Sequence, residues 1–499
     1  MNESVPEPPT ADGSADSVAG IARDVASGRR RASDVLAECL RRHESLAPRI
    51  NALVQLRRQE AEAEAARIDG AAAAHGPHGR GLPLAGVPVS VKECFAIRGL
   101  STTLGIPGRR GLVDAADAEI VVRLRAAGAV VVGKGNVPQA MYLHETDNPV
   151  WGLTRHPLDA TRGPGGSSGG DAALVATGVV PLAVGNDLAG SVRQPAHACG
   201  VAALLPTTAT LGGAGAFQTM PHLTAVRPRA GLLARTVDDL ALGLAAVAGP
   251  PTEALAMPRR VAWWDDAGPI AASPAVRRAV HEAVERLAVR GVEMVHVPGA
   301  IATEAAWLLL AIVAADGGAD VRRLFAGGRP MRGVSRLLAI ARLPRRWRPL
   351  VAALLRLTGS RIEAEGVLRT GRRTPDELAA LVVARDALAT RFAAAVAGCD
   401  AVVSPVSALP ALRQGTAARL VLAAAPCLLA NLLDLPAGAV PVTTVAPEET
   451  RGRSWSLDPV IRAATATDRG SAGLPVGVQV IGCPGRGEAT VLEVMRWIE

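Results

Sequence analysis

The sequence predicts an α/β protein organised around a largely parallel or mixed β-sheet. Short runs rich in β-branched residues alternate with helical patterns, and this alternation is typical of βαβ units. The chain has 499 residues, of which 49% are hydrophobic and 20% are charged. Such apolar content fills a large core, and the low charge excludes a disordered chain. Length alone leaves several domains and one large domain as alternatives.

The N-terminal part of the chain supplies the first predicted elements. We expect a disordered tail over residues 1–17, which is acidic and rich in proline and serine, and then two helices up to about residue 74. The run GVPVSVK over residues 86–92 predicts a buried strand that ends at Lys92. The later segment AEIVVRLRAAGAVVVGKGNVP predicts a helix, a turn and a second buried strand.

The stretch from Thr161 to Gly200 is the richest in glycine and serine. Its first part, TRGPGGSSGGDAALVATG, predicts a loop that opens a helix. Its second part, VVPLAVGNDLAGSVRQPA, predicts a buried strand that runs into a tight turn. Near the C-terminus, GLPVGVQVIG over residues 473–482 predicts another strand, followed by the helix EATVLEVMRWIE. Strands and helices therefore alternate to the end of the sequence.

Charge and cysteine content limit the class of function. The net charge of +8 would suit an anionic partner, but only 7 Trp, 4 Phe and 1 Tyr are present, without interleaved basic residues or a known nucleic-acid motif. We therefore expect no nucleic acid as a partner. The six cysteines are scattered without a CxxC pair, which favours buried thiols over disulfides. With no signal peptide and no membrane-spanning run, we expect a cytoplasmic protein.

Lysine is almost absent from this arginine-rich chain. Of 54 basic residues, only Lys92 and Lys134 are lysines. Arginine stays charged at any accessible pH, whereas a buried lysine can lose its proton. Each lysine could be a chance survivor, but Lys92 lies at the end of a predicted strand and is a candidate base.

A serine nucleophile needs a base, and its oxyanion needs preorganised N–H donors. None of the nine histidines, His144 included, lies in a recognised triad motif such as G-x-S-x-G, so we expect them to be structural or solvated. The alternative base is a neutral lysine that acts through a second hydroxyl. Lys92, the serines of GGSSGG over residues 165–170 and Ser191 in GNDLAGSVRQPA supply those parts in that order.

Four segments of the chain resemble the amidase-signature hydrolases. They are GVPVSVKE, RGPGGSSGGDAALVATGVVPLAVGNDLAGSVRQPAHACGVAALLPT, LDLPAGAVPVT and GLPVGVQVIG. The resemblance implies one large domain over residues 18–499, with a central twisted mixed β-sheet covered by helices on both faces. It also implies an amidase that forms an acyl-enzyme and needs neither metal nor organic cofactor. The sequence has no HExxH, CxxC or His-rich cluster that would suggest one.

The resemblance also assigns a role to each residue of the predicted site. It implies a Ser–cisSer–Lys triad in which Ser191 is the nucleophile, Ser167 is the relay on a cis peptide bond and Lys92 is the neutral base. The implied oxyanion hole consists of the backbone N–H groups of Leu188, Ala189, Gly190 and Ser191, and the implied supporting side chains are Ser168, Asp187 and Arg193. Nothing in GGSSGG alone selects Ser167 over Ser168.

Three positions depart from the family pattern. Ala189 stands where glycine is usual, which adds a methyl group to a tight turn. Asn186 replaces a common threonine, and Leu205 replaces a lysine outside the triad. Because all three catalytic side chains are present, we expect an active hydrolase. Lys134 lies in another family segment, VVGKGNVP, and is expected to form structural hydrogen bonds.

Several local strings resemble the fatty acid amide hydrolase branch of the family. They are VKECF, STTLGIP, NVPQAMY, TDNPVWG and LLDLPAGAVPVTTV. They imply a small-molecule substrate that is a lipophilic or fatty acyl amide. They also place Met141 and Tyr142 beside the acyl channel, although both could equally be ordinary core residues.

Residues 330–362 contain two apolar helical segments separated by LPRRWRP and surrounded by arginines and Trp347. This pattern is typical of a helix pair on an anionic membrane surface, and burial against the protein core is the alternative. The resemblance implies a membrane-contacting cap in this region, and so a peripheral attachment to the membrane. A homodimer is also compatible with the sequence.

Two other functions remain open from the sequence. An acyltransferase would form the same acyl-enzyme and pass the acyl group to an amine instead of water, in a biosynthetic pathway. A catalytically silent membrane-surface protein would keep the fold without the chemistry.

Overall fold

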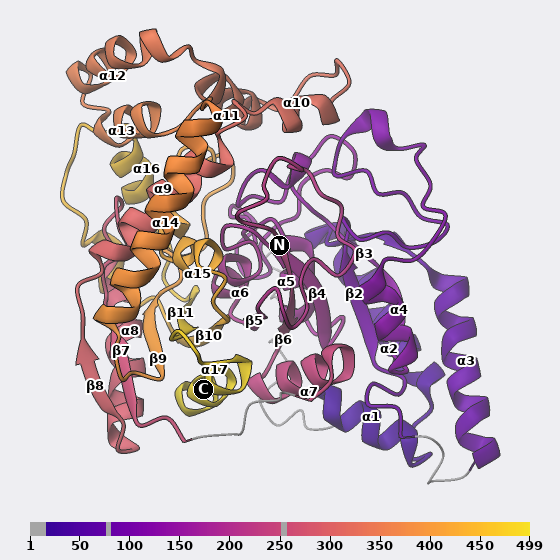
Figure 1. The fold of residues 1–499 in the computed structure, drawn as a ribbon. Coiled ribbons are helices and arrows are strands. Elements are labelled where there is room, and N and C mark those ends of the chain that lie inside the picture. The colour runs from indigo at the N-terminus through magenta and orange to yellow at the C-terminus, as the bar shows by residue number, and fades with distance from the viewer. Residues whose placement is uncertain (1–15, 76–80, 251–256) are drawn as a thin grey trace.

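The computed structural model describes residues 16–75, 81–250 and 257–499, and this part of the chain forms an α/β fold around one 11-stranded sheet (Figure 1). The strand order across the sheet is β1-β3-β2-β4-β6-β5-β10-β11-β9-β7-β8. The strands are β1 Leu53–Leu56, β2 Pro88–Lys92, β3 Val130–Gly135, β4 Leu182–Asp187, β5 Ala202–Leu205, β6 Arg229–Ala234, β7 Arg260–Trp263, β8 Glu293–His296, β9 Ala401–Pro405, β10 Ala437–Thr444 and β11 Pro475–Gly482.

The sheet is mixed, as the sequence predicts. Strand β2 is parallel to both β3 and β4, and β7 is parallel to both β8 and β9. The other neighbouring pairs of the described sheet are antiparallel. Strands β2, β4 and β11 are buried almost throughout, which explains their continuous apolar runs.

Helices cover both faces of this sheet (Figure 1). Helices α5 and α6 contact each other and pack on one face, and α4, α7, α8 and α17 pack on the other. The α-helices are α1 Val18–Ala26, α2 Ala32–Ile50, α3 Arg58–His75, α4 Glu119–Ala126, α5 Gly169–Ala176, α6 Arg193–Cys199, α7 Val237–Ala248, α8 Pro274–Val289, α9 Ala300–Val313, α10 Ala319–Leu324, α11 Arg332–Arg342, α12 Arg348–Leu357, α13 Arg361–Arg369, α14 Pro375–Ala395, α15 Leu428–Leu432, α16 Pro459–Asp468 and α17 Glu488–Ile498. The short 3-10 helices are η3 Pro107–Arg109, η4 Gln139–Met141, η5 Arg345–Trp347, η6 Val421–Cys427 and η7 Pro447–Arg451.

The N-terminal part differs from the sequence prediction. Two helices were expected up to about residue 74, whereas the structure has three, with strand β1 between α2 and α3. Helix α2 ends where Asn51 adopts a left-handed conformation, and β1 then pairs with β3 at the edge of the sheet. Most of the expected disordered tail, residues 1–15, lies outside the described residues. The side chain of Ser17 caps helix α1 by accepting a hydrogen bond from the Gly20 N–H.

The remaining predicted elements are present. Strand β2 ends at Lys92, helix α4 and strand β3 form the predicted helix–turn–strand unit, and β11 is followed by α17. All six cysteines are buried and free, as expected. Leu205, in place of the family's lysine, is fully buried on β5, so this departure affects packing.

The segment over residues 330–362 forms the two predicted helices, α11 and α12, joined by η5. Their apolar faces have different surroundings. Leu338 and Ala341 of α11 are buried. On α12, by contrast, Leu354 is 55% exposed and Leu357 is 84% exposed. Burial against the protein therefore holds for α11, whereas α12 presents large apolar side chains to the outside.

Arg348 is an exception among the arginines of this segment. The sequence places it with the arginines that surround the apolar faces, but its side chain is buried. It donates hydrogen bonds to the carbonyls of Ile340 and Leu343 at the end of α11 and of Val367 near the end of α13. The Ile340 carbonyl also accepts a hydrogen bond from the Leu343 N–H at 3.2 Å. Because its guanidinium donates to carbonyls at the ends of both α11 and α13, Arg348 joins the two helix ends.

We predict that Arg348→Met destabilises this helical region by about 3 kcal/mol, because several buried carbonyls lose their donor. Urea unfolding followed by circular dichroism measures the change. Arg346→Met is the matched control, since Arg346 is exposed and stacks over the Trp347 ring, and it should change stability by less than about 0.5 kcal/mol. Equal effects of the two substitutions would show that Arg348 has no anchoring role.

Candidate active site

The predicted site residues come together at the carboxyl ends of two neighbouring parallel strands. Lys92 is the last residue of β2, and Asn186 and Asp187 end β4 beside it. Ser167 lies in the loop that leads into α5, and Ser191 lies in the turn between β4 and α6. In α/β proteins, ligands bind at this edge of the sheet.

Lys92 is completely buried and faces polar oxygens. Its Nζ lies 2.7 Å from Ser167 Oγ, 3.1 Å from the Asn186 carbonyl oxygen and 2.5 Å from Asn186 Oδ1. Burial lowers the pKa of Lys92 below its ordinary value. A buried lysine with a lowered pKa is suited to exchange a proton with the hydroxyl that it contacts.

The Gly166–Ser167 peptide bond is cis. Neighbouring groups fix the loop on both sides of it. The Gly166 N–H donates to Gln194 Oε1 at 3.0 Å, and the Ser168 N–H donates to the Ser191 carbonyl at 3.1 Å. The Ser168 hydroxyl is 3.5 Å from the Asn186 carbonyl oxygen. Of the two serines in GGSSGG, Ser167 is therefore the one that contacts Lys92.

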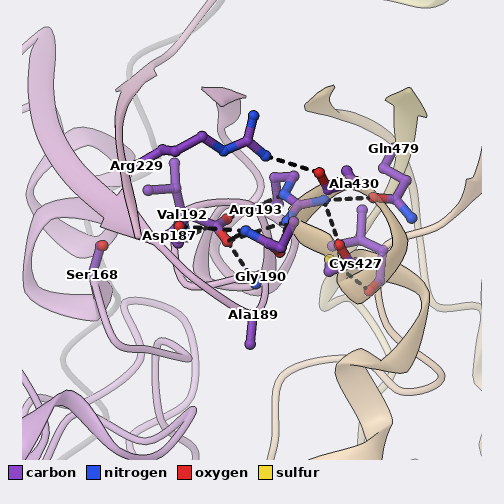
Figure 2. Close-up of polar contacts among 12 residues, drawn as sticks. Ser168, Asp187, Ala189, Gly190, Val192, Arg193, Arg229, Cys427, Ala430 and Gln479 are labelled. Atoms are coloured by element: carbon purple, nitrogen blue, oxygen red, sulfur yellow. Dashed lines mark hydrogen bonds and ion pairs between the residues drawn. The ribbon is translucent and has the colours of Figure 1, made fainter. Parts of the chain in front are cut away.

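A buried ion pair shapes the turn that carries Ser191 (Figure 2). The two carboxylate oxygens of Asp187 accept hydrogen bonds from the Gly190 N–H at 2.7 Å and the Val192 N–H at 3.1 Å. The same oxygens each accept a hydrogen bond from the Arg193 guanidinium at 3.1 Å. Arg193 also holds the pKa of Asp187 below its ordinary value despite complete burial.

Arg193 connects this turn to the C-terminal half of the chain. Its guanidinium donates to the Cys427 carbonyl at 3.0 Å, Gln479 Oε1 at 3.1 Å and Asn431 Oδ1 at 2.6 Å. Together with the two bonds to Asp187, these contacts engage all five donors of an arginine. The charge is therefore fully hydrogen-bonded although the side chain is completely buried.

Gly190 is the residue that the turn requires. Its φ of +93° lies in the region that favours glycine, and a Cβ there would come within 2.8 Å of Cys427 Cβ. Ala189 does not have a positive φ, so its extra methyl group causes no strain and instead lines a cavity. The ring of His144 holds the same turn, because its Nε2 lies 3.0 Å from the Ala189 carbonyl oxygen. Burial lowers the pKa of His144 to about 4, so the ring is neutral near pH 7.

The four predicted oxyanion-hole donors are not equivalent. The Gly190 N–H already donates to Asp187 Oδ1. For the N–H groups of Leu188, Ala189 and Ser191 we find no acceptor within the described parts of the chain. These three groups are therefore available to a ligand oxygen at the turn.

Two cavities meet at Ser191, whose side chain is otherwise buried. The larger has a volume of about 230 Å³ and is mostly apolar; Met141 and Tyr142, both predicted to bind substrate, are part of its wall. The smaller, of about 50 Å³, has Ser167 and Asn186 in its wall as well as Ser191. Met141 and Leu188 border both spaces. A molecule bound across Ser191 could thus place one part in each cavity.

Lys134 has the structural role expected for it. It is fully buried, and its Nζ donates to the Ser101 carbonyl, Thr102 Oγ1 and Asp114 Oδ2 at 2.9–3.0 Å. Lys134 does not line either of the two cavities at Ser191. Its buried hydrogen bonds therefore give it a structural role.

One group of side chains among the described residues could hold a metal ion. His222, Asp316 and Asp320 offer ligand atoms within 4.8 Å of one another. In the structure the His222 ring instead pairs with Asp320, with 2.7 Å between Nδ1 and Oδ2. None of the three borders the Ser191 cavities, so the site described above makes no use of them.

Two contacts of the site were not predicted. The sequence identifies Asn186 only as a departure from threonine. In the structure, its carbonyl and side-chain oxygens both accept hydrogen bonds from Lys92 Nζ. His144 was expected to be structural and is so, but it also borders the larger cavity. The motif match could have drawn attention to Asn186, because it directly precedes Asp187 in the most specific segment.

Comparison with known proteins places this arrangement in a family. The model of the family described as Amidase matches residues 34–492. The chain belongs to the amidase-signature family. Fatty-acid amide hydrolase 1 of Sus scrofa is 33% identical to it over 452 residues, which cover 84% of this chain and 76% of that protein. A glutamyl-tRNA(Gln) amidotransferase subunit of Nitratidesulfovibrio vulgaris is 40% identical over 233 residues, 47% of this chain and 46% of that protein.

Solved structures agree with the fold. A fatty acid amide hydrolase structure superposes with a TM-score of 0.81 at 22% identity, covering 97% of this chain and 84% of that one. A 6-aminohexanoate cyclic dimer hydrolase does so with a TM-score of 0.73 at 24% identity, covering 97% and 96%. This amidase is therefore an amide-hydrolysing α/β enzyme of the amidase-signature type.

A second buried aspartate near Lys92, Asp171, has a raised pKa, whereas that of Asp187 is lowered. Asp171 accepts a hydrogen bond from Ser90 Oγ at 2.8 Å, and its other carboxylate oxygen, Oδ2, has no partner among the described residues. Burial raises the pKa of Asp171 from 3.8 to about 7. The two aspartates are equally buried, and what separates them is the Arg193 charge beside Asp187, together with the larger number of donors around that carboxylate.

The same substitution at these two positions should have opposite effects on stability. Asp187→Asn should destabilise the fold by about 3–5 kcal/mol near pH 7, because it leaves Arg193 charged and unpaired in the core. Asp171→Asn should stabilise the fold near pH 7. Folded Asp171 keeps its proton up to about pH 7 while the unfolded residue loses it near 3.8, so the wild type loses stability as pH rises between these values.

Urea unfolding of both variants between pH 4 and pH 8 measures these changes. In Asp171→Asn the loss of stability across this range should be smaller than in the wild type. Stabilisation by Asp187→Asn, or destabilisation by Asp171→Asn, would contradict the assigned charge states.

Proposed function

We propose that this enzyme hydrolyses lipophilic or fatty acyl amides through a Ser191–cisSer167–Lys92 triad and an acyl-enzyme intermediate. The observation that carries the proposal is the contact between Lys92 and Ser167 at the point where the mostly apolar cavity meets Ser191. The relative from Sus scrofa is named a fatty-acid amide hydrolase, which agrees with the apolar wall.

The surroundings of Lys92 support its role as a base. A neutral amine has two N–H donors and one lone pair. The carbonyl and side-chain oxygens of Asn186 can accept both N–H groups. The lone pair is then left for the hydroxyl hydrogen of Ser167, whose Oγ is 2.7 Å away. In this arrangement Lys92 accepts a proton from Ser167, and Ser167 in turn accepts one from Ser191.

The reaction then proceeds as acyl transfer. Ser191 Oγ attacks the amide carbonyl while its proton passes through Ser167 to Lys92. The free N–H groups of Leu188, Ala189 and Ser191 stabilise the oxyanion, and the relay returns the proton to the leaving amine. Water hydrolyses the acyl-enzyme by the same path. We place the acyl chain in the larger, apolar cavity and the amine in the smaller one.

We further propose that α12 contacts an anionic membrane surface. Trp347, Leu350, Leu354 and Leu357 are exposed, and exposed arginines flank them. Among the described helices, none combines the length and the apolar character needed to span a bilayer. Leu-rich faces, an interfacial tryptophan and basic residues are the features that bind such surfaces.

The triad makes a graded prediction. Ser191→Ala should lose fluorophosphonate labelling and lower amide hydrolysis by at least about a thousandfold. Ser167→Ala should lose nearly as much hydrolytic activity. Ser168→Ala should retain more, because the Ser168 side chain does not contact Lys92. Hydrolysis of a panel of acyl amides of different chain length measures this. A relay at Ser168 would reverse the order of the two variants.

The base role of Lys92 predicts a specific pH dependence. The value of kcat/KM should fall as pH drops through the pKa of Lys92, because the protonated amine cannot accept a proton. Asn186→Asp places a carboxylate beside Lys92, which raises its pKa, so this fall should begin at a higher pH. Asn186→Thr keeps an oxygen acceptor without a charge and serves as the control. An unchanged profile in Asn186→Asp would argue against Lys92 as the base.

The membrane contact can be tested separately with liposomes. Arg345, Arg346 and Arg356 are exposed beside the apolar face, and reversing all three to Glu should weaken flotation with anionic vesicles by more than about tenfold. Arg348 is left unchanged because it is buried. The control reverses exposed arginines outside this region, Arg277 and Arg413. Equal binding of both variants would remove the proposed role of α12.

A further inference from the structure

The mostly apolar wall of the larger cavity contains one cluster of charged side chains. Among the described residues that form its wall, Arg336, Glu363 and Arg419 are the charged ones, since His144 is neutral. They come from three separate segments, with Arg336 on α11, Glu363 on α13 and Arg419 shortly before η6. Side chains brought together from distant parts of the sequence form a built feature of the cavity.

The charges are not balanced within the cluster. Glu363 Oε1 accepts a hydrogen bond from Arg336 at 2.5 Å and lies 3.6 Å from Arg419 Nε. One carboxylate therefore faces two guanidinium groups, which leaves a net positive charge. Arg419 donates no side-chain hydrogen bond to any residue that the structure describes, so its donors are available to a ligand.

The cluster lies at the outer part of the cavity. The side chains of Arg336 and Arg419 are 38% and 43% exposed. Ser191, by contrast, is only 9% exposed. Apolar side chains, among them Leu337 and Ile340 of α11, make up much of the remaining wall. A ligand that extends from the buried Ser191 to the more exposed part of the cavity thus meets the two arginines there.

We propose that this cavity selects acyl groups whose far end carries a carboxylate, so that the preferred substrates are monoamides of long-chain dicarboxylic acids. This inference rests on the proposed function, because it assumes that the acyl chain occupies the larger cavity. Arginine presents a planar set of donors that matches a carboxylate, and the apolar wall beside it strengthens the attraction. Arg336 and Arg419 bind the anion, and Glu363 limits its affinity by competing for both guanidinium groups.

The test compares pairs of substrates that differ in one charge. Each pair consists of a dicarboxylic acid monoamide and its ω-methyl ester, assayed over a series of chain lengths without lipid. At the chain length that reaches the cluster, the acid should have the lower KM. Arg336→Gln and Arg419→Gln should each raise its KM about fivefold and leave the ester nearly unchanged.

Two further variants separate recognition from structure. Glu363→Gln removes the competing anion and should lower the KM for the acid, a gain that a damaged cavity would not give. Arg413→Gln changes an exposed arginine of the same segment outside the cavity wall and should leave both substrates unaffected. The preference for the acid should also weaken as salt concentration rises.

The outcomes distinguish this inference from the proposed function. Hydrolysis of neutral long-chain amides without any preference for the ω-acid overturns only the anion-binding role. An arginine effect on vesicle flotation, with no effect on KM in the lipid-free assay, assigns the cluster to lipid headgroups and also overturns it. If neither the acids nor the neutral amides are hydrolysed, the proposed function itself fails.

Discussion

The buried ion pair between Asp187 and Arg193 is the interaction on which the site depends. The carboxylate binds the N–H groups of Gly190 and Val192 and so fixes the path of the turn around Ser191. The guanidinium binds the Cys427 carbonyl, Gln479 and Asn431, which belong to the other half of the chain. An unpaired charge at this depth would be strongly unfavourable, so the two halves can pack only when this network is complete. The same contacts that close the fold therefore position Ser191, the proposed nucleophile.

The pKa values at the site follow from the charges and the hydrogen-bond donors that surround each buried group, and for Asp187 the Arg193 charge comes first. Asp187 is surrounded by donors and keeps its charge, whereas Asp171 has one donor from Ser90 and holds its proton. Lys92 lies among oxygens of Asn186 and Ser167, no carboxylate of the described residues is in direct contact with it, and burial lowers its pKa. A neutral lysine can accept a proton, and this is the property that arginine could not supply in a chain otherwise almost free of lysine.

The two helices over residues 330–362 face different surroundings. Helix α11 turns its apolar side chains inward and contributes Leu337, Ile340 and Arg336 to the larger cavity. Helix α12 exposes Leu354 and Leu357. Arg348 joins the helix ends, so the inward and outward surfaces are held in a fixed relation. One short part of the sequence would then contact the substrate chain, the charged group at its end and a membrane surface.

The sequence by itself determined the fold class, the strand that ends at Lys92 and the order of the three proposed catalytic residues, because these depend on local periodicity and on specific motifs. It failed at β1, a four-residue edge strand whose pairing with β3 is a long-range contact. It also left Ser167 and Ser168 equivalent, placed Arg348 outside and gave Asn186 no role. Tertiary structure decided these points, since each depends on which distant atoms lie within hydrogen-bond distance of a side chain. Composition shows that a lysine is rare; only packing shows which hydroxyl it contacts.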